Sequence, residues 1–408
     1  MSIGKPSFNP RANFTVPQPH FILIGNYPPD RQESMIRFAG ILALGLKRRG
    51  FTVEVVAPQP RLVSANASPG GGLKKWLAYV DKWILFPNAL RHIVHRAENE
   101  FGKNVHYHVC DHSNAPYLGH LPPERSAITC HDVLAIRGAL GYPDSYCPAS
   151  RTGVILQKWI LKHLSSAKHV ACVSGLTLRH LCEIAGKKNP EPGWTVLHNA
   201  FNAPFQRIEP AEALNVLKRR NVSVPQPFLL HVGSNLPRKN RRMLLQMIAQ
   251  PGQPWPGHIC YAGEPAGPQL LGEAPKLGVQ DRVHSVAKPD HETLCALYSL
   301  AHAFVFPSLS EGFGWPLIEA QACGVPVIAS DFEPLPEVSG GAALHANPND
   351  ASAFGAALRM LDNAATRTSL VERGLENARR FDLNTMIDGY LALHGLSAPA
   401  PTPVSVPA

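Results

Sequence analysis

The chain has 408 residues, of which 45% are hydrophobic and 17% are charged, so it is too long for one ordinary core and too apolar for a disordered protein. Its formal net charge of +9 suits an anionic partner such as a phosphate, a nucleotide or an acidic membrane surface. The sequence contains no helix-turn-helix, zinc-finger or aromatic RNP pattern, so we do not expect a nucleic-acid partner.

The cysteines and the apolar runs indicate the compartment. The 8 cysteines are scattered without a C-x-x-C pair, and several lie in apolar runs, which is typical of free thiols in a reducing cytosol. No long apolar segment precedes Phe21, so a secretory signal peptide is not expected. No uninterrupted apolar run approaches the roughly 18 residues that a spanning helix needs. The sequence therefore predicts a cytoplasmic protein.

The first half of the chain alternates short β-branched runs with helix-like segments, which predicts a parallel sheet with helices on both faces. A strand at 20–26 is followed by a polar loop and then by a periodic helix at 34–49, which ends in the sequence KRRG. The next strand, FTVEVV, completes a βαβ unit. The loop after the first strand lies at the carboxyl end of the sheet, where open α/β sheets bind ligands.

The second half of the chain repeats this pattern after a polar, proline-rich stretch at 201–226, which we interpret as a linker around one short helix. The strand PFLLHVGS opens a second doubly wound unit, and HICYAG, VHSVA, HAFVFP and PVIAS continue it. The sequence therefore predicts two Rossmann-like α/β domains that face a cleft.

A glycine-rich loop, SLSEGFG, follows the predicted strand HAFVFP, and a helix follows the loop. Glu311 lies in the loop, and Glu319 is expected in the first turn of the helix. Gly312 and Gly314 allow close approach of the backbone to a ligand, and their free amides favour an anion such as a phosphate. Two nearby carboxylates also suggest a glycosidase, but a glycosidase has no use for a phosphate-binding basic loop in the same domain.

That basic loop is HVGSNLPRKNRR, in which four cations gather at the start of a predicted helix. Cations oppose the helix dipole at that end, so they indicate an anionic ligand, and two of them with helix amides can neutralise a diphosphate. We expect Arg241 and Arg242 to be solvated surface charges.

The segment 296–330, with Glu311 and Glu319, closely resembles the E-x7-E signature of the retaining glycosyltransferases of family 4, which have the GT-B fold. The resemblance implies that Glu311 lies beside the donor sugar and that Glu319 binds the ribose of the nucleotide. It places the loop residues Gly312, Phe313 and Gly314 at the donor as well.

Three other segments are similar to parts of the same family. The sequence GSNLPRKN resembles the family's G-x3-P-R-K-N/G loop, which implies that Arg238 and Lys239 clamp the diphosphate. His131, in AITCHD, stands where family members carry a His that reaches the donor sugar across the cleft, and Asp132 is expected to orient or cap locally. The loop NYPPDRQESM implies contacts with the donor phosphates and the acceptor through Arg31, Gln32 and Ser34, although Ser34 is equally suited to cap a helix.

Two further segments have competing interpretations. His106, His108 and Cys110 alternate along one predicted strand, but ligands confined to one strand rarely surround a metal, so we expect no metal and no cofactor. The segment 73–97 mixes tryptophans with basic residues. We favour a core-facing helix with a basic face, and contact with the anionic inner membrane is the alternative.

The predicted activity is a metal-independent, retaining transfer of a hexose from GDP-mannose or a UDP-hexose to a hydroxyl of a glycan or lipid-linked acceptor, in surface or exopolysaccharide synthesis. The alternatives are a non-catalytic nucleotide-sugar-binding subunit and a same-fold sugar-nucleotide epimerase. The expected organisation is an acceptor-binding domain at 1–204, a linker at 205–226, a nucleotide-sugar-binding domain at 227–380, a helix at 381–395 that crosses back to the N-terminal domain, and an unstructured tail at 396–408.

Overall fold

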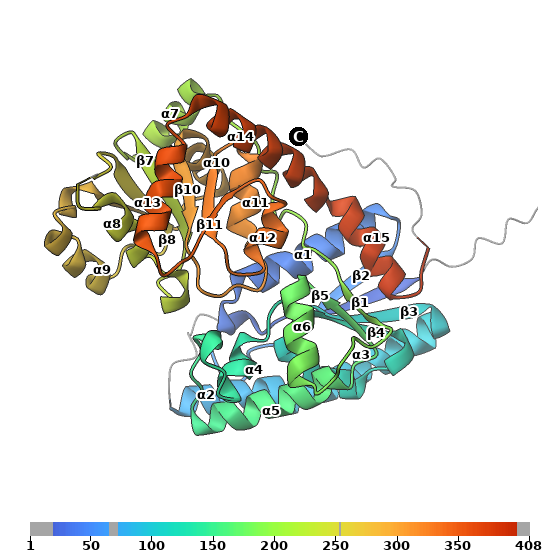
Figure 1. Cartoon of the computed structure of the whole chain (residues 1–408). Coiled ribbons are helices and arrows are strands. Elements are labelled where there is room, and N and C mark those ends of the chain that lie inside the picture. Colours follow the sequence, from blue (N-terminus) through green and yellow to red (C-terminus); the bar gives the residue numbers. More distant parts are fainter. Residues whose placement is uncertain (1–18, 65–71, 253, 398–408) are drawn as a thin grey trace, which may run out of the picture.

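The computed structural model describes residues 19–64, 72–252 and 254–397, and these form two lobes that face each other across a cleft (Figure 1). Each lobe is built on a six-stranded sheet, and every strand pair in the described residues is parallel. The prediction of two doubly wound, Rossmann-like α/β domains facing a cleft is therefore confirmed.

The N-terminal lobe, lower in Figure 1, has the strand order β2-β1-β3-β4-β5-β6. Its strands are β1 (His20–Ile24), β2 (Thr52–Val56), β3 (Val105–Val109), β4 (Ser126–Cys130), β5 (His169–Cys172) and β6 (Trp194–Val196). Its α-helices are α1 (Glu33–Arg48), α2 (Leu73–Val80), α3 (Phe86–Phe101), α4 (Leu134–Ala139), α5 (Arg151–Ser165) and α6 (Gly175–Ile184).

The C-terminal lobe has the strand order β12-β11-β10-β7-β8-β9. Its strands are β7 (Phe228–Gly233), β8 (His258–Gly263), β9 (Val283–Ala287), β10 (Ala303–Phe306), β11 (Val327–Ser330) and β12 (Leu344–Ala346). Its α-helices are α7 (Pro210–Arg219), α8 (Arg242–Ile248), α9 (Pro268–Glu273), α10 (His291–Leu300), α11 (Trp315–Ala322), α12 (Leu335–Ser339), α13 (Ala351–Met360) and α14 (Ala364–Ala378).

Burial explains why these sequences form central parallel strands. The strands β1, β3 and β10 are buried at every position, because helices cover both faces of each sheet. The helix α1 shows the matching pattern, since Phe38, Leu42 and Leu46 recur at four-residue intervals on its buried side.

The last helix, α15 (Leu383–Leu393), leaves the C-terminal lobe and packs against α1 and the N-terminal sheet (Figure 1). A Cβ atom on Gly45 of α1 would lie 2.3 Å from Ile387 of α15, so the glycine permits the close packing of the two helices. Arg49 and Asp388 add an ion pair of 2.5 Å. Residues 398–408, most of the tail that we expected to be unstructured, lie outside the described residues.

Two expectations about local structure need correction. The segment at 205–226 contains α7, whose Ala213, Val216 and Leu217 are buried in the core of the C-terminal lobe, so this helix is part of that lobe and not a free linker. The segment at 73–97 is not one regular helix, because a π-helical turn at Asp81–Leu85 separates α2 from α3. Asp81 is buried there and accepts a hydrogen bond of 2.8 Å from the Tyr27 hydroxyl.

The strand order places two switch points at the cleft, where adjacent strands lead to helices on opposite faces. In the N-terminal sheet the switch point lies between β1 and β3, and in the C-terminal sheet it lies between β7 and β10. The loops that carry most of the predicted site residues follow these strands. In the described residues, no helix is both long enough and apolar enough to cross a membrane.

Candidate active site

A cleft of about 650 Å³ opens between the two lobes at the carboxyl ends of both sheets. It brings together most of the residues that the sequence singled out: Ser34, His131, Arg238, Lys239, Glu311, Gly312, Phe313, Gly314 and Glu319. Arg31 and Gln32 are not among the residues that line it. The cleft therefore unites segments up to 285 residues apart in sequence, from Ser34 to Glu319.

On the C-terminal side of the cleft, two cations contact one buried carboxylate. Lys239 Nζ donates to Glu311 Oε1 at 2.5 Å, and Arg238 Nη1 donates to Glu311 Oε2 at 2.9 Å. Burial alone raises the pKa of Glu311, but Lys239 and Arg238 outweigh it and lower the pKa to about 2. Burial also lowers the pKa of Lys239, despite its ion pair with Glu311. The three groups together carry one net positive charge in a buried position.

Backbone geometry explains how the loop after β7 presents these cations. A 3-10 turn over Pro237–Lys239 ends at Asn240, which has a left-handed φ of 48° and whose side chain donates to the carbonyls of Pro307 and Pro348. These bonds tie the loop after β7 to the loop after β10. The two loops at the switch point are therefore held together before any ligand binds.

The expectation that Arg241 is a solvated surface charge is wrong. Its side chain is only 6% exposed, lies over the Tyr261 ring at 4.2 Å, and donates to the Glu264 carbonyl at 2.9 Å. Arg242 is exposed as predicted and pairs with Glu273. Arg241 thus supports the fold behind Arg238 and Lys239 and is not among the residues that line the cleft.

The loop at 312–314 lies against the N-terminal lobe. A Cβ atom on Gly312 would lie 2.0 Å from the His131 carbonyl oxygen, so only glycine fits this contact. Gly314 has a φ of 107°, in the range that favours glycine. Within the described chain, the N–H groups of Gly312, Phe313 and Gly314 donate to no acceptor, so these three amides are available to a ligand.

Glu319 occupies a buried position on α11, with 6% of its surface exposed. It is the fifth residue of the helix, so the expectation of a place in the first turn is wrong. The Tyr298 hydroxyl donates to its Oε2 at 3.0 Å. Burial raises the pKa of Glu319 to about 7, although the Tyr298 hydrogen bond and Arg37 both oppose the increase. Its Oε1 has no hydrogen-bond donor among the described residues.

His131 reaches the cleft from the end of β4 and is 6% exposed. Its Nε2 lies 3.0 Å from the Cys110 carbonyl oxygen, and because a carbonyl only accepts, we assign the proton to Nε2. Burial lowers the pKa of His131, so the ring is neutral and Nδ1 is an acceptor. This Nδ1 is buried and has no partner within the described chain.

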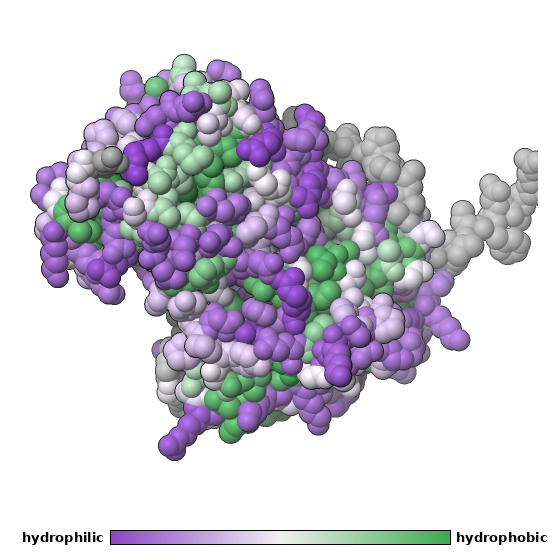
Figure 2. Space-filling view, in the orientation of Figure 1, coloured by the Kyte–Doolittle hydropathy of each residue, from purple (hydrophilic) through white to green (hydrophobic). Residues whose placement is uncertain are grey.

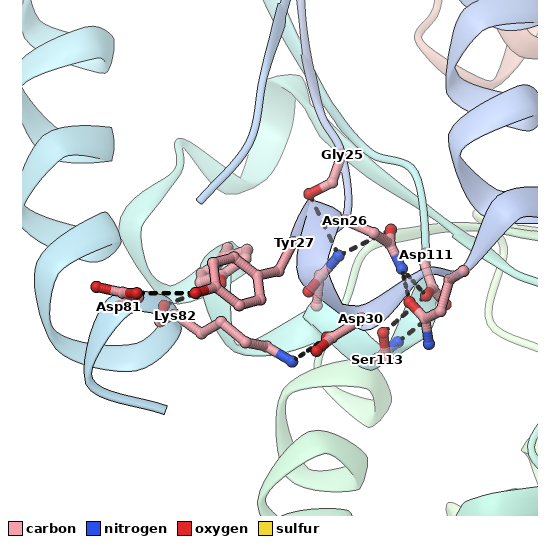
Figure 3. Close-up of polar contacts among 11 residues, drawn as sticks. Gly25, Asn26, Tyr27, Asp30, Asp81, Lys82, Asp111 and Ser113 are labelled. Carbon is pink, nitrogen blue, oxygen red and sulfur yellow. Dashed lines mark hydrogen bonds and ion pairs between the residues drawn. The ribbon is translucent and has the colours of Figure 1, made fainter. Parts of the chain in front are cut away.

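The N-terminal switch point is filled by a polar network (Figure 3). Asn26, after β1, donates to Asp111, after β3, at 2.5 Å, and also to Gln32. Lys82 pairs with Asp30 at 2.6 Å, so the loop after β1 is bound at both ends. Gln32 is thus an exposed residue at the N-cap of α1, and its side chain accepts a hydrogen bond from Asn26 of the same lobe.

Ser34 and Arg31 differ in position. Ser34 is the second residue of α1 and lines the cleft, and the N-cap position belongs to Gln32, so the alternative of Ser34 as a helix cap is wrong. Arg31 has a left-handed φ of 52° and an exposed side chain, at the end of the 3-10 turn Pro28–Asp30.

The cleft also contains polar residues that we did not single out from the sequence, among them Arg37 and Asn199. Arg37 of α1 lines it from the N-terminal lobe and acts electrostatically on Glu319 of the other lobe. Asn199, 2% exposed, lines it with a buried Oδ1 that has no partner in the described chain. Arg37 lies three residues, almost one helical turn, after Ser34, and this spacing is the signal that could have found it.

His106 and His108, which we considered as metal ligands from the sequence, do not line the cleft. His108 is buried between Thr129, at 2.8 Å, and His394, the residue that follows α15, at 3.2 Å. Among the residues that the model describes, no group of three or more His, Cys, Asp or Glu side chains is arranged to hold a metal ion.

Comparison with solved structures identifies the fold class. Sucrose-phosphate synthase from Thermosynechococcus elongatus superimposes with a TM-score of 0.68 at 20% sequence identity, covering 93% of this chain and 98% of that one. At this identity the likeness shows the fold alone. The protein has the two-domain α/β architecture of the GT-B glycosyltransferases, as the sequence predicts.

Sequence comparison adds the kind of domain. Residues 216–377 match the family model described as "Glycosyl transferases group 1", so the C-terminal lobe contains a glycosyltransferase group 1 domain. O-antigen chain mannosyltransferase B of Escherichia coli is 29% identical over 337 residues, which is 79% of this chain and 83% of that protein. O-antigen chain mannosyltransferase RfbU of Salmonella typhimurium is 25% identical over 346 residues, 85% of this chain and 86% of that protein.

Proposed function

We propose that the protein is a retaining glycosyltransferase that moves a hexose from a nucleotide-diphosphate sugar to a hydroxyl of a glycan or lipid-linked acceptor in surface polysaccharide synthesis. The observation that carries this proposal is the buried Arg238, Lys239 and Glu311 cluster at the C-terminal switch point, opposite His131. The similarity to two O-antigen mannosyltransferases makes mannose the first sugar to test, with UDP-hexoses as the alternative donors.

In this proposal, the diphosphate of the donor binds to Arg238 and Lys239. Both are largely buried, so their attraction for a diphosphate is screened little by water. Glu311 remains beside them and keeps the cluster from holding two uncompensated buried charges in the absence of donor. The ribose hydroxyls bind to Glu319, whose Oε1 is free to accept and whose Oε2 is oriented by Tyr298.

The sugar then lies between the amides of 312–314 and His131. Because Nδ1 of His131 is a buried acceptor without a partner, it suits a hydroxyl donor on the sugar. The acceptor hydroxyl attacks the anomeric carbon from the side of the leaving group. The bond from that carbon to the phosphate oxygen breaks, and the proton of the acceptor passes to the leaving diphosphate, so configuration is retained.

We also propose that no metal ion is needed, because Arg238 and Lys239 supply the positive charge that the leaving diphosphate requires. Protein treated with a chelator should keep its turnover of the donor within about twofold. A requirement for Mg²⁺ or Mn²⁺ would contradict this part of the proposal.

The surface around 73–97 is proposed to contact an anionic membrane. Trp76 and Ile84 are both 57% exposed, and Ile155 and Trp159 of α5 are 71% and 37% exposed. The rings of Trp83 and Trp159 lie 5.0 Å apart, which joins the two segments. Figure 2 shows a hydrophobic area over α5 at the lower edge of the molecule. Exposed tryptophan beside lysine is typical of surfaces that bind anionic lipid.

The direct test is to incubate the purified chain with a panel of GDP-mannose and UDP-hexoses and to measure donor binding and the release of nucleoside diphosphate. We expect one donor to bind and to be hydrolysed slowly without acceptor. Binding without any turnover, even with acceptor extracts, would favour a non-catalytic subunit. No binding of any donor would refute the proposal.

A further inference from the structure

The helix α6 of the N-terminal lobe begins directly against the loop at 312–314 of the C-terminal lobe, which we call the donor loop. Ser174, at the N-cap of α6, is fully buried, and its hydroxyl donates to the Gly312 carbonyl oxygen at 2.7 Å. The Thr177 hydroxyl, one turn along the helix, donates to the same oxygen at 3.3 Å. One carbonyl of the donor loop therefore receives two hydrogen bonds from the opposite lobe.

A second set of contacts fixes the position of this helix end. The Glu337 carboxylate, in α12 of the C-terminal lobe, accepts from the Gly175 N–H at 3.1 and 3.0 Å. His198 Nε2 lies 2.7 Å from the same carboxylate. Val173, just before α6, is buried in the core of the C-terminal lobe. The two hydroxyls are thus attached to a rigid contact between the lobes and not to a mobile loop.

The orientation of a peptide group links this contact to the donor. In a trans peptide, the C=O of one residue and the N–H of the next point in opposite directions. Because the Gly312 carbonyl points to α6, the Phe313 N–H points away from it, and this N–H has no acceptor within the described chain. Gly312 and Phe313 both line the cleft.

We propose that Ser174 and Thr177 are positioning residues that hold the Gly312 carbonyl out of the cleft and thereby turn the Phe313 N–H toward the bound donor. Without the two hydroxyls, the peptide group between Gly312 and Phe313 can rotate, because glycine is flexible. The Gly312 carbonyl would then face the electron-rich oxygens of the nucleotide-sugar in place of the Phe313 N–H. This inference rests on the proposed function, since it concerns the same donor site.

The test uses the full chain, the single variant Ser174→Ala and three further variants. Thr177→Val keeps the shape of the side chain but removes the hydroxyl, whereas Thr177→Ser keeps the hydroxyl. Ser174→Ala combined with Thr177→Val removes both donors. Ser174 also caps α6 by accepting from the Thr177 N–H, so Ser150→Ala is the matched control: it removes the equivalent cap of α5, where Ser150 accepts from the Gly153 N–H.

For the nucleotide-sugar that the wild-type protein binds from the GDP-mannose and UDP-hexose panel, we expect the double variant to bind about tenfold more weakly. Thr177→Val should show a smaller loss that Thr177→Ser restores. Ser150→Ala should lower the melting temperature about as much as Ser174→Ala does while leaving donor binding unchanged.

The outcomes separate the two proposals. If the wild-type protein binds a donor and the double variant binds it equally well, the inference is overturned and the proposed function stands. An equal loss of donor binding in Ser150→Ala would also overturn the inference, because loss of a helix cap alone would then explain the effect. If the wild-type protein binds no donor, both proposals fail.

Discussion

The two switch points that face the cleft are built in different ways. In the C-terminal lobe, the loops after β7 and β10 bring the side chains of Lys239 and Glu311 into contact and leave three loop amides free. In the N-terminal lobe, the loops after β1 and β3 meet in a polar network in which Asn26 donates a hydrogen bond to Asp111 (Figure 3). The first switch point is prepared for an anion, whereas the second is closed by its own hydrogen bonds.

This difference indicates a division of labour. In the proposed function, the C-terminal lobe holds the donor through charge. The N-terminal lobe contributes a neutral histidine, a hydroxyl, an exposed cation and an amide to the cleft: His131, Ser34, Arg37 and Asn199. Variants in the C-terminal lobe should therefore remove donor binding. Variants of His131 should leave the nucleotide bound and change what happens to the sugar.

The largest effect is expected from Lys239→Met. The change removes one cation of the clamp and leaves the buried Glu311 with Arg238 alone, so binding of nucleoside diphosphate should weaken on the order of a hundredfold. Titration calorimetry with GDP and UDP measures the loss. Arg242→Gln is the control, because Arg242 is exposed and pairs with Glu273 outside the cleft. Equal binding by Lys239→Met and the wild-type protein would show that Lys239 does not bind the diphosphate.

Gly312→Ala should come next. The new methyl group would lie 2.0 Å from the His131 carbonyl oxygen, so the donor loop has to move away from the N-terminal lobe, at a cost of about 1–3 kcal/mol. Donor turnover should fall more than tenfold, and the melting temperature should drop by several degrees. Gly272→Ala in α9 meets no atom within 4 Å and should behave as the wild-type protein. Full activity of Gly312→Ala would show that the two lobes do not meet at this loop.

The pH dependence of donor binding should follow Glu319. Its pKa of about 7 means that the charge of this carboxylate, which we propose accepts the ribose hydroxyls, is lost as the pH falls through 7, so donor affinity should decrease below that value. The Tyr298 hydrogen bond opposes the raised pKa, so Tyr298→Phe should move the midpoint to a higher pH. Tyr261→Phe, which loses a hydrogen bond to the Arg241 carbonyl, should not move it. If the midpoint of the pH dependence stays the same in Tyr298→Phe, ionisation of Glu319 does not control donor binding.

The smallest effect concerns the contact of α15 with the N-terminal lobe. Burial lowers the pKa of His106 to about 4, whereas an unfolded histidine titrates near 6.5. Between these values the unfolded chain binds more protons, so stability should fall as the pH drops from 6.5 toward 4. The change in melting temperature over this range should be smaller in His106→Phe. The exposed His95→Gln should leave it as in the wild-type protein. An unchanged pH dependence in His106→Phe would assign the acid sensitivity to other groups.

The sequence predicted the residues on the C-terminal side of the cleft better than those on the N-terminal side, for a physical reason. Arg238 and Lys239 are adjacent in the chain, and Glu311 and Glu319 flank one strand-to-helix connection, so short segments carry the chemistry. Arg37, by contrast, comes to the cleft from α1, and the local signal for it is only its position three residues after Ser34 on the same helix.

The local errors have the same origin. Arg241 follows the clamp in a basic run, yet it turns inward because the Tyr261 ring and two carbonyls offer it partners from β8 and the loop after it. At the break between α2 and α3, the buried Asp81 accepts a hydrogen bond from Tyr27, which lies 54 residues earlier in the chain. Parallel-sheet cores and glycine-rich loops can be predicted from the sequence, whereas buried polar contacts between distant segments cannot.

The proposed difference between the two lobes is tested most sharply by comparing Lys239→Met with His131→Ala, in their binding of GDP and UDP and in their turnover of the matching nucleotide-sugar. We predict that Lys239→Met loses nucleotide binding, while His131→Ala binds the nucleotide as the wild-type protein does and loses turnover of the nucleotide-sugar about a hundredfold. Loss of nucleotide binding in His131→Ala as large as in Lys239→Met would contradict the division of labour between the two lobes.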